Sequence, residues 1–160
     1  MKLVVFGGRD FINYHETKEV CDSISGITTL IHGGALGADT CGKLWGENTA
    51  GVDVELFEAD WGRFKGGAGH RRNEQMAEAC DIGVGFWDGT SGGTKNMIAC
   101  MKKYSKPFTI HSYTTLYLHN IVPYLADMIP NRKFCVLDEK KGRFFSEELP
   151  KHISMYKLDF

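Results

Sequence analysis

Three glycine-rich segments of this chain each follow a short apolar run, at residues 6–10, 32–39 and 86–94. Short apolar runs that end in a turn are typical of buried strands. If these runs are parallel strands, the segments leave the sheet at its carboxyl edge, where open α/β sheets place their ligands. Glycines let backbone N–H groups approach an anion closely, and the helix after each segment would point its positive end there. The pattern predicts a phosphate-binding rim along one edge of a sheet.

Strand-like and helix-like segments alternate through most of the chain. The predicted strands cover residues 2–6, 28–32, 52–57, 82–86 and 107–110, and the predicted helices cover 14–25, 38–50, 70–80 and 93–104. The polar, glycine-bearing stretch 59–69 is predicted to be a loop long enough to have a function. This alternation requires a parallel sheet with right-handed crossovers. The predicted fold class is α/β, a Rossmann-like three-layer sandwich with a mainly parallel sheet and a small C-terminal extension.

The pattern changes after residue 111, which divides the chain into a ligand-binding domain at 1–111 and an extension at 112–160. Within the extension we predict a helix over 113–129, a turn at 130–133, a strand over 134–137 and a charged turn at 138–143. The remainder is compatible with a small antiparallel addition, a dimer arm or a flap over the site. Its aromatic content favours a homo-oligomer, although these rings can also cover the sheet. The aromatic residues in question are Tyr113, Tyr117, Tyr124, Phe134, Phe144 and Phe145.

Composition narrows the function classes. Nineteen lysines and arginines against 20 acidic residues give a net charge of −1, without the bias expected for binding to nucleic acid or membranes. Five isolated cysteines indicate reduced, mostly buried thiols. No apolar run reaches the roughly 18 residues of a membrane-spanning helix, so we expect a cytoplasmic protein.

Several common catalytic motifs are missing. The six histidines show no metal-ligand spacing, so no metal site is predicted. The chain has no complete Walker P-loop, nucleophile elbow or G-x-G-x-x-G dinucleotide signature. We therefore expect neither a Walker-type kinase, a serine hydrolase nor an NAD-dependent oxidoreductase, and we assign no cofactor.

Four groups of residues are candidates for ligand contact. In the first, Arg9 offers a planar donor fork that suits phosphate, whereas Asp10 can bind the ligand or only the loop backbone. The second has more glycines than a helix cap needs, and its Asp39 can cap the helix or accept from a ribose hydroxyl. These two groups are Gly7, Gly8, Arg9 and Asp10, then Gly33, Gly34, Ala35, Gly37 and Asp39.

The third group is Asp60, Trp61, Arg72 and Asn73. We place Arg72 and Asn73 in the first turn of the helix predicted at 70–80, where a guanidinium beside free N–H groups is unfavourable unless an anion is bound. Trp61 can stack on a base or simply cover the sheet edge. We expect Arg63 and Lys65 to be solvated.

The fourth group combines small hydroxyl side chains with glycine amides, more than a single N-cap requires, and we expect it to bind phosphate. The strand that precedes it is expected beside the first strand. Its members are Asp88, Gly89, Thr90, Ser91, Gly92, Gly93 and Thr94.

Taken in order, these motifs resemble the YspA-like branch of the SLOG superfamily, Rossmann-like proteins related to the LOG phosphoribohydrolases and to the DNA-processing protein DprA. The motifs are G-G-R-D-F at 7–11, H-G-G-A with G-A-D at 32–39, A-D-W at 59–61, R-N at 72–73 and D-G with G-G-T at 88–94. The resemblance covers about residues 1–111. It implies a site for a nucleotide or a nucleotide-derived ligand.

The chain departs from the LOG pattern at one position. LOG hydrolases have a glutamate three residues after the threonine of G-G-x-G-T, and Met97 stands at that place. Because methionine is neither a general base nor a charge stabiliser, LOG-type cleavage of an N-glycosidic bond would need a relocated carboxylate. The candidates are Asp10, Asp39, Asp60, Glu74 and Asp88.

Three functions follow as hypotheses. The first is a sensor or sequestering protein for a small nucleotide-derived ligand, such as an ADP-ribose-like or cyclic-nucleotide signal. The second is a nucleoside-phosphate N-glycosidase, and the third is a DprA-like binder of single-stranded DNA. The third is disfavoured by the net charge of −1 and by the lack of a long basic stripe.

Overall fold

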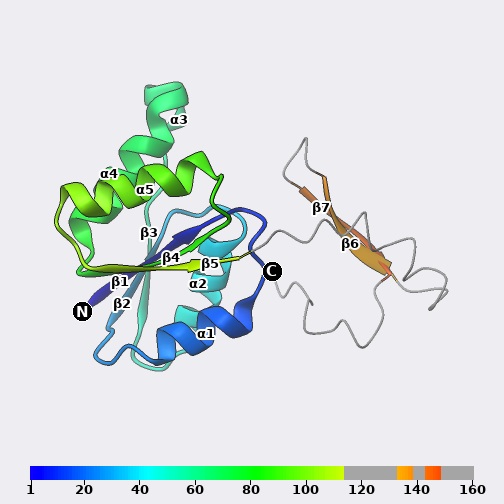
Figure 1. Cartoon of the computed structure of the whole chain (residues 1–160), viewed down its shortest axis with the longest axis horizontal. Coiled ribbons are helices and arrows are strands. Elements are labelled where there is room, and N and C mark those ends of the chain that lie inside the picture. Colours follow the sequence, from blue (N-terminus) through cyan, green and yellow to red (C-terminus); the bar gives the residue numbers. More distant parts are fainter. Residues whose placement is uncertain (114–132, 139–142, 149–160) are drawn as a thin grey trace. The chain divides into compact units, whose positions relative to one another are not determined.

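The computed structural model describes residues 1–113 and two later strands. Five parallel strands form one sheet in the order β3-β2-β1-β4-β5. This arrangement, with helices on both faces, confirms the predicted Rossmann-like α/β class (Figure 1). The strands are β1 (Lys2–Gly7), β2 (Thr29–His32), β3 (Asp53–Leu56), β4 (Ile82–Trp87) and β5 (Phe108–Ser112).

The helices flank the sheet in two layers. Figure 1 shows α1 and α2 on one face and α4 and α5 on the other. After β3 the chain crosses the sheet and returns as β4 beside β1, so the loops after β1 and β4 leave from the point where the strand order reverses. The helices are α1 (Tyr14–Asp22), α2 (Ala38–Glu47), α3 (Trp61–Phe64), the 3₁₀ helix η1 (Lys65–Gly67), α4 (Ala68–Ala79) and α5 (Gly92–Lys103).

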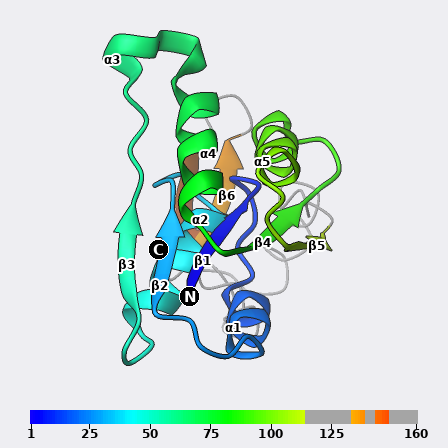
Figure 2. The ribbon, with the colours of Figure 1, turned by 90° about the vertical axis from the view of Figure 1, so that its left-hand side faces the viewer.

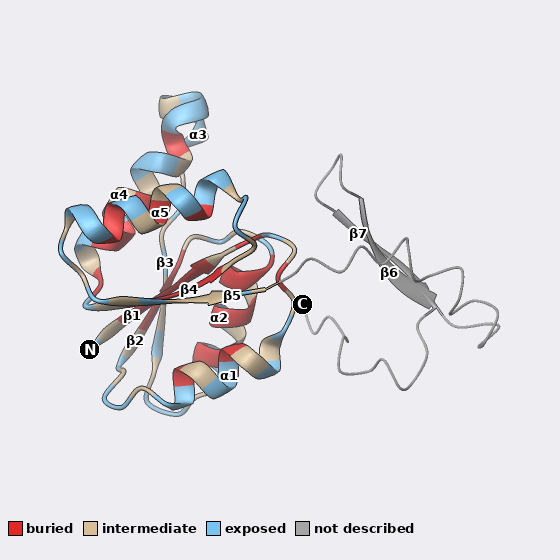
Figure 3. Cartoon of the chain, viewed as in Figure 1, coloured by how far each residue is buried: buried red, intermediate tan, exposed pale blue. Residues whose placement is uncertain are grey.

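Strand β1 divides the core into two apolar layers. Leu3 and Val5 pack in the cluster that includes α1 and α2, whereas Val4 and Phe6 pack in the cluster that includes α4 and α5. This alternation follows from the two-residue period of a strand, and each fully buried side chain of this kind contributes roughly 1.5–3 kcal/mol. Figure 3 shows the buried residues along the central strands and on the sheet-facing sides of the helices.

Helix α2 lies close to the sheet because Gly42 has no side chain. A Cβ atom at Gly42 would lie 2.6 Å from the Cβ of Val5, well inside van der Waals contact. Since α2 is the helix that follows β2, this close packing helps to fix the loop between them.

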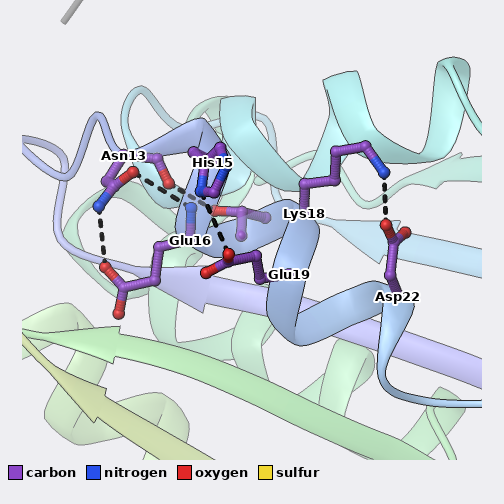
Figure 4. A network of polar contacts seen from close by, with 7 residues as sticks. Asn13, His15, Glu16, Lys18, Glu19 and Asp22 are labelled. Carbon is purple, nitrogen blue, oxygen red and sulfur yellow. Dashed lines mark hydrogen bonds and ion pairs between the residues drawn. The ribbon is translucent and has the colours of Figure 1, made fainter. Parts of the chain in front are cut away.

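Polar contacts on α1 cap this helix and line its exposed side (Figure 4). The Asn13 side chain accepts a hydrogen bond from the Glu16 N–H at 3.1 Å and donates to the Glu16 carboxylate at 3.1 Å. Lys18 pairs with Asp22 one turn later. Asp22 also accepts a hydrogen bond from the Trp45 indole at 2.8 Å, which ties α1 to α2.

Residues 59–69 are not the loop that we predicted. They contain all of α3 and η1 and the start of α4. Asp60 caps α3 by accepting a hydrogen bond from the Arg63 N–H at 2.9 Å. Helix α4 therefore begins at Ala68, and Arg72 and Asn73 lie in its second turn. The expectation that these two residues stand beside free N–H groups of a first turn was wrong.

The chain divides into two compact units, Met1–Tyr113 and Thr114–Phe160. In the second unit, β6 (Lys133–Asp138) and β7 (Arg143–Glu148) pair antiparallel, with Val136 opposite Phe145. Asp138 and Arg143, which we assigned to a charged turn, belong to these strands. Apart from Tyr113 and Lys133, the helix predicted at 113–129 and the turn predicted at 130–133 lie outside the described residues. Within the described part of the chain, no helix is both long and apolar enough to span a membrane.

Candidate functional site

A cavity of about 350 Å³ opens at the carboxyl ends of β1, β2 and β3, and we call it the edge cavity. Figure 2 shows these three strands side by side, with α3 beyond the end of β3. Six of the predicted contact residues line the cavity: Arg9, Gly33, Gly34, Ala35, Trp61 and Arg72. Three more lining residues were not predicted: Leu56, Glu58 and Ala59.

Arg72 reaches the edge cavity from α4. Its Nη1 donates a hydrogen bond to the Gly33 carbonyl oxygen, and its Nε donates to the Asn73 side chain at 3.2 Å. A Cβ atom on Gly33 would collide with Arg72 Nη1, so any side chain at this position would displace the guanidinium group. The half-buried guanidinium is thus held in place at the wall of the cavity.

Arg9 also lines the cavity and comes from the loop after β1. The turn before it is fixed because the Gly8 N–H donates to Phe86 O at 3.0 Å and the Gly8 carbonyl accepts from the Ala38 N–H at 3.1 Å. The Arg9 side chain itself is exposed. Two guanidinium groups from separate elements therefore line one cavity.

Two exposed apolar side chains complete the opening. Trp61 is 56% exposed and Leu56 is 48% exposed, although large apolar groups are more often covered. Both line the edge cavity. They provide an apolar surface beside the arginines.

Asp39 shapes the loop after β2 from beneath. Its carboxylate accepts hydrogen bonds from the N–H groups of Gly33 at 2.9 Å and Ala35 at 3.2 Å. Burial raises the pKa of Asp39 to about 6, although the Ala35 amide and the charge of Arg72 act in the opposite direction. The Asp39 carboxylate is buried and already accepts two hydrogen bonds from the loop, so its direct contacts are with the protein backbone.

His32 accepts the third amide of this loop. The Gly34 N–H donates to His32 Nδ1 at 3.1 Å, and burial, with the charges of Lys43 and Arg72, lowers the pKa of His32 below its usual value. The amides of residues 33–35 thus donate within the protein. What this loop offers a ligand is its shape and the Arg72 guanidinium.

Gly37 serves the contact between two loops. Its φ of 79° is one that glycine adopts readily, and a Cβ atom there would collide with the Gly8 carbonyl. The Ala38 N–H at the start of α2 is already bonded to that carbonyl. Gly7 is similarly confined, because a Cβ atom would meet the Phe86 carbonyl.

Asp10 holds Tyr113, a partner that neither of its expected roles included. The Tyr113 hydroxyl donates to the Asp10 carboxylate at 2.5 Å, and the tyrosine ring packs on Phe11 with centroids 5.1 Å apart. Burial, together with the hydrogen bond to Asp10, raises the pKa of Tyr113 above its usual value. Tyr113 therefore belongs to the packing of the first unit.

The loop 88–94 organises itself largely through its own side chains, and none of its residues is among those that line the edge cavity. Asp88 accepts hydrogen bonds from the N–H groups of Thr90 at 2.9 Å and Ser91 at 2.8 Å. Burial opposes the shift, but these amides and the Thr90 hydroxyl hold the pKa of Asp88 below its usual value. Ser91 caps α5 by accepting from Thr94, whose side chain is buried.

The glycines of this loop are not in close contact with other parts of the protein at their Cβ positions. Space surrounds the Cβ positions of Gly89, Gly92 and Gly93, with no heavy atom within 4 Å. Asn73 links α4 to the loop by donating to Gly93 O at 3.3 Å and to Asn96 at 2.9 Å. Ligand contact by residues 88–94 and by Asn73 stays a prediction.

The structure also locates the carboxylates that would have to replace the missing glutamate. Met97 is 1% exposed, packed in the apolar cluster under α5. None of the five candidates that we named lines the edge cavity, whereas Glu58 does. Sequence reasoning missed Glu58 because it belongs to no motif; its position directly after a predicted strand was the available signal.

The cysteines whose surroundings the structure describes are buried. Cys21, Cys41, Cys80 and Cys100 are free and buried, as predicted. Burial raises the pKa of Cys21 and Cys41 to about 12, which leaves both thiols protonated near neutral pH. Among the described residues, no group of three or more potential ligands could hold a metal ion.

The strand order, the parallel sheet and the loops at its carboxyl edge define a Rossmann-like α/β protein. Residues 1–64, which run from β1 to the end of α3, match the YspA, cpYpsA-related SLOG family. Over residues 1–64, the match confirms the resemblance to this family that was inferred from the motifs. Neither curated proteins nor solved structures gave a match to the chain.

Proposed function

We propose that this protein binds a nucleotide or a nucleotide-derived phosphate ligand in the edge cavity and acts as a sensor or sequestering protein. The observation that carries the proposal is the meeting of Arg9, Arg72 and the exposed Trp61 around one cavity. Its volume of about 350 Å³ lies at the lower end of the usual range for small-ligand sites, about 300–1,000 Å³. SLOG-type sequence over residues 1–64 supports a nucleotide-related ligand.

The two arginines suit the phosphate. A guanidinium group presents planar N–H donors that match two phosphate oxygens at once. Arg72 is held by Gly33 and Asn73, so it loses little freedom when a ligand binds. Arg9 is exposed and can close onto the same anion.

Trp61 suits the base. Its indole is more than half exposed and lies on the cavity wall, where stacking on a base contributes roughly 1–3 kcal/mol. Arginine donors and an aromatic ring in one cavity match the two chemically distinct ends of a nucleotide.

Binding without turnover is favoured over hydrolysis. The position of the LOG glutamate holds a buried methionine, and Asp39, Asp88 and Glu74 are committed to protein partners. Glu58 supports the alternative function, an N-glycosidic hydrolase with a relocated carboxylate, because it lines the same cavity.

The test is a titration of the full chain with nucleotides, ADP-ribose isomers and cyclic nucleotides, with recovery of each compound afterwards. Saturable binding with the compound intact, weakened by Arg72→Ala, supports a sensor or sequestering protein. Release of base or ribose phosphate that stops in Glu58→Gln supports the hydrolase. No binding by any compound overturns the nucleotide site.

We also propose a cytoplasmic homo-oligomer that uses aromatic residues of the extension. Tyr113 does not contribute a free ring, since it packs on Phe11 within the first unit. The side chains of the other aromatic residues named above lie outside the described structure. Light scattering of the full chain would measure the oligomeric state, and a monomer at all concentrations would contradict the proposal.

A further inference from the structure

A second cavity of about 260 Å³ lies beside the edge cavity, between α3 and α4, and we call it the α3–α4 cavity. Glu58 and Arg72 line both cavities. The two volumes therefore adjoin at these side chains. The two cavities are thus near enough for the two ends of one ligand to be considered together.

The α3–α4 cavity has its own pair of arginines. Arg63 and Arg71 both lie against the ring of Phe64, with guanidinium carbons 5.1 Å and 4.4 Å from its centroid. Both arginine side chains line the cavity and are exposed. Stacking on an aromatic ring uses the face of a guanidinium group and leaves its N–H edge available.

Those N–H edges have no protein acceptor among residues 1–113. No hydrogen bond or ion pair in this part of the chain uses the guanidinium group of Arg63 or Arg71. The positive charge of Arg71 acts on Glu74 only as a minor contribution to lowering its pKa. Two cations stacked on Phe64 thus line the cavity, and neither has a carboxylate partner within residues 1–113.

Acidic groups in the same cavity indicate what accompanies the anion. Glu58 and Asp60 line it together with the arginines. Carboxylates repel phosphate but accept hydrogen bonds from sugar hydroxyls. The mixture of arginines and carboxylates fits a sugar phosphate better than a polyanion such as a nucleic-acid strand.

We propose that the α3–α4 cavity binds the second sugar phosphate of a ligand whose nucleotide half occupies the edge cavity. The ligand class is then a nucleotide linked through a diphosphate to a second sugar, with Arg72 between the two halves and Arg63 and Arg71 on the distal phosphate. This inference rests on the proposed nucleotide site and extends it.

The test compares matched ligands by calorimetry on the full chain: adenosine monophosphate with ADP-ribose, and uridine monophosphate with UDP-glucose. At least one diphosphate sugar should bind about tenfold or more tightly than its monophosphate. The double variant Arg63→Ala with Arg71→Ala should lose that advantage and keep its affinity for the monophosphate within about twofold. Lys102→Ala, an exposed cation on α5, is the control and should change neither affinity.

A second variant guards against a folding defect. Arg71→Lys keeps the charge but loses the planar fork, so it should give an intermediate loss, and the thermal midpoint of each variant should match that of the wild type. Two results overturn the role of the α3–α4 cavity and leave the nucleotide site standing. One is equal affinity for the diphosphate sugar and the monophosphate, and the other is a tighter binding of the diphosphate sugar that survives in the double variant. Absence of nucleotide binding overturns both. Salt-sensitive binding of a thymidine decamer that is lost in the double variant would point instead to single-stranded DNA.

Discussion

The guanidinium group of Arg72 donates a hydrogen bond to the carbonyl oxygen of Gly33, although 39 residues separate them in the chain. This bond joins α4 to the loop after β2, and both residues line the edge cavity. It fixes a cation at the wall of this cavity.

Arg72→Ala should weaken the binding of a phosphate-bearing nucleotide about tenfold or more, because a charge-assisted hydrogen bond contributes roughly 1.5–3 kcal/mol. Arg72→Lys should recover only part of this affinity, since lysine lacks the planar fork. Calorimetric titration measures both, with Lys102→Ala as the control. Unchanged affinity in Arg72→Ala would place the phosphate elsewhere.

Trp61→Ala should lower nucleotide affinity by a factor of about 5 to 150, equivalent to roughly 1–3 kcal/mol of stacking. Its effect on the unfolding free energy should be small because the side chain is 56% exposed. Trp61→Phe should keep most of the affinity. If Trp61 only covers the sheet edge, Trp61→Ala will lower stability and leave affinity unchanged, which urea unfolding and titration together would reveal.

Asp39 should make the folded state less stable as the pH rises from about 4 to 6. The folded-state pKa of Asp39 is about 6 against an ordinary value of 3.8, so the folded protein holds this proton more tightly than the unfolded chain does. The contribution is complete below pH 3.8 and is lost as the pH rises through about 6. At about 1.36 kcal/mol for each pKa unit, its full size is on the order of 1–3 kcal/mol.

Asp39→Asn isolates this titration. The amide oxygen can still accept hydrogen bonds from Gly33 and Ala35, but the side chain no longer ionises. Urea unfolding at several pH values should show a flatter dependence between pH 4 and 6 than in the wild type. Identical slopes in the two proteins would mean that Asp39 ionises without cost.

Met97→Glu should not create a hydrolase. Because Met97 is 1% exposed among apolar side chains, a carboxylate there would be buried without a partner and should lower the unfolding free energy by about 3 kcal/mol or more. Met97→Leu, which keeps volume and polarity, should cost less than about 1.5 kcal/mol. Unfolding curves and a base-release assay measure the two effects, and release of base by Met97→Glu would contradict this reasoning.

Periodicity predicted the layers well because β1 and β4 are nearly continuous apolar runs followed by glycine turns. The prediction for 59–69 was wrong because the glycines of this stretch suggested a loop. Its short helices are supported by the Asp60 cap on the Arg63 N–H and by the stacking of two arginine side chains on Phe64. Helix ends elsewhere moved by a few residues, as at Asp22, where α1 stops short of the predicted residue 25.

The candidate site was harder to predict for a specific reason. Glycine content shows where a backbone can approach a ligand, but not whether its amides are already used. The backbone N–H groups of the loop after β2 donate to Asp39 and His32, a pairing that the sequence does not reveal. Glu58 belongs to no motif, so only the fold shows that it lines two cavities.

The hydrogen bond from Tyr113 to Asp10 means that a fragment of the first unit must extend to residue 113 to keep its contacts. A fragment cut after residue 111, at the predicted domain boundary, would remove the ring that packs on Phe11 and the hydroxyl that holds Asp10, directly beside Arg9. A fragment of residues 1–113 keeps both. The two residues after that boundary therefore decide whether Phe11 keeps an aromatic neighbour and Asp10 keeps a hydroxyl donor.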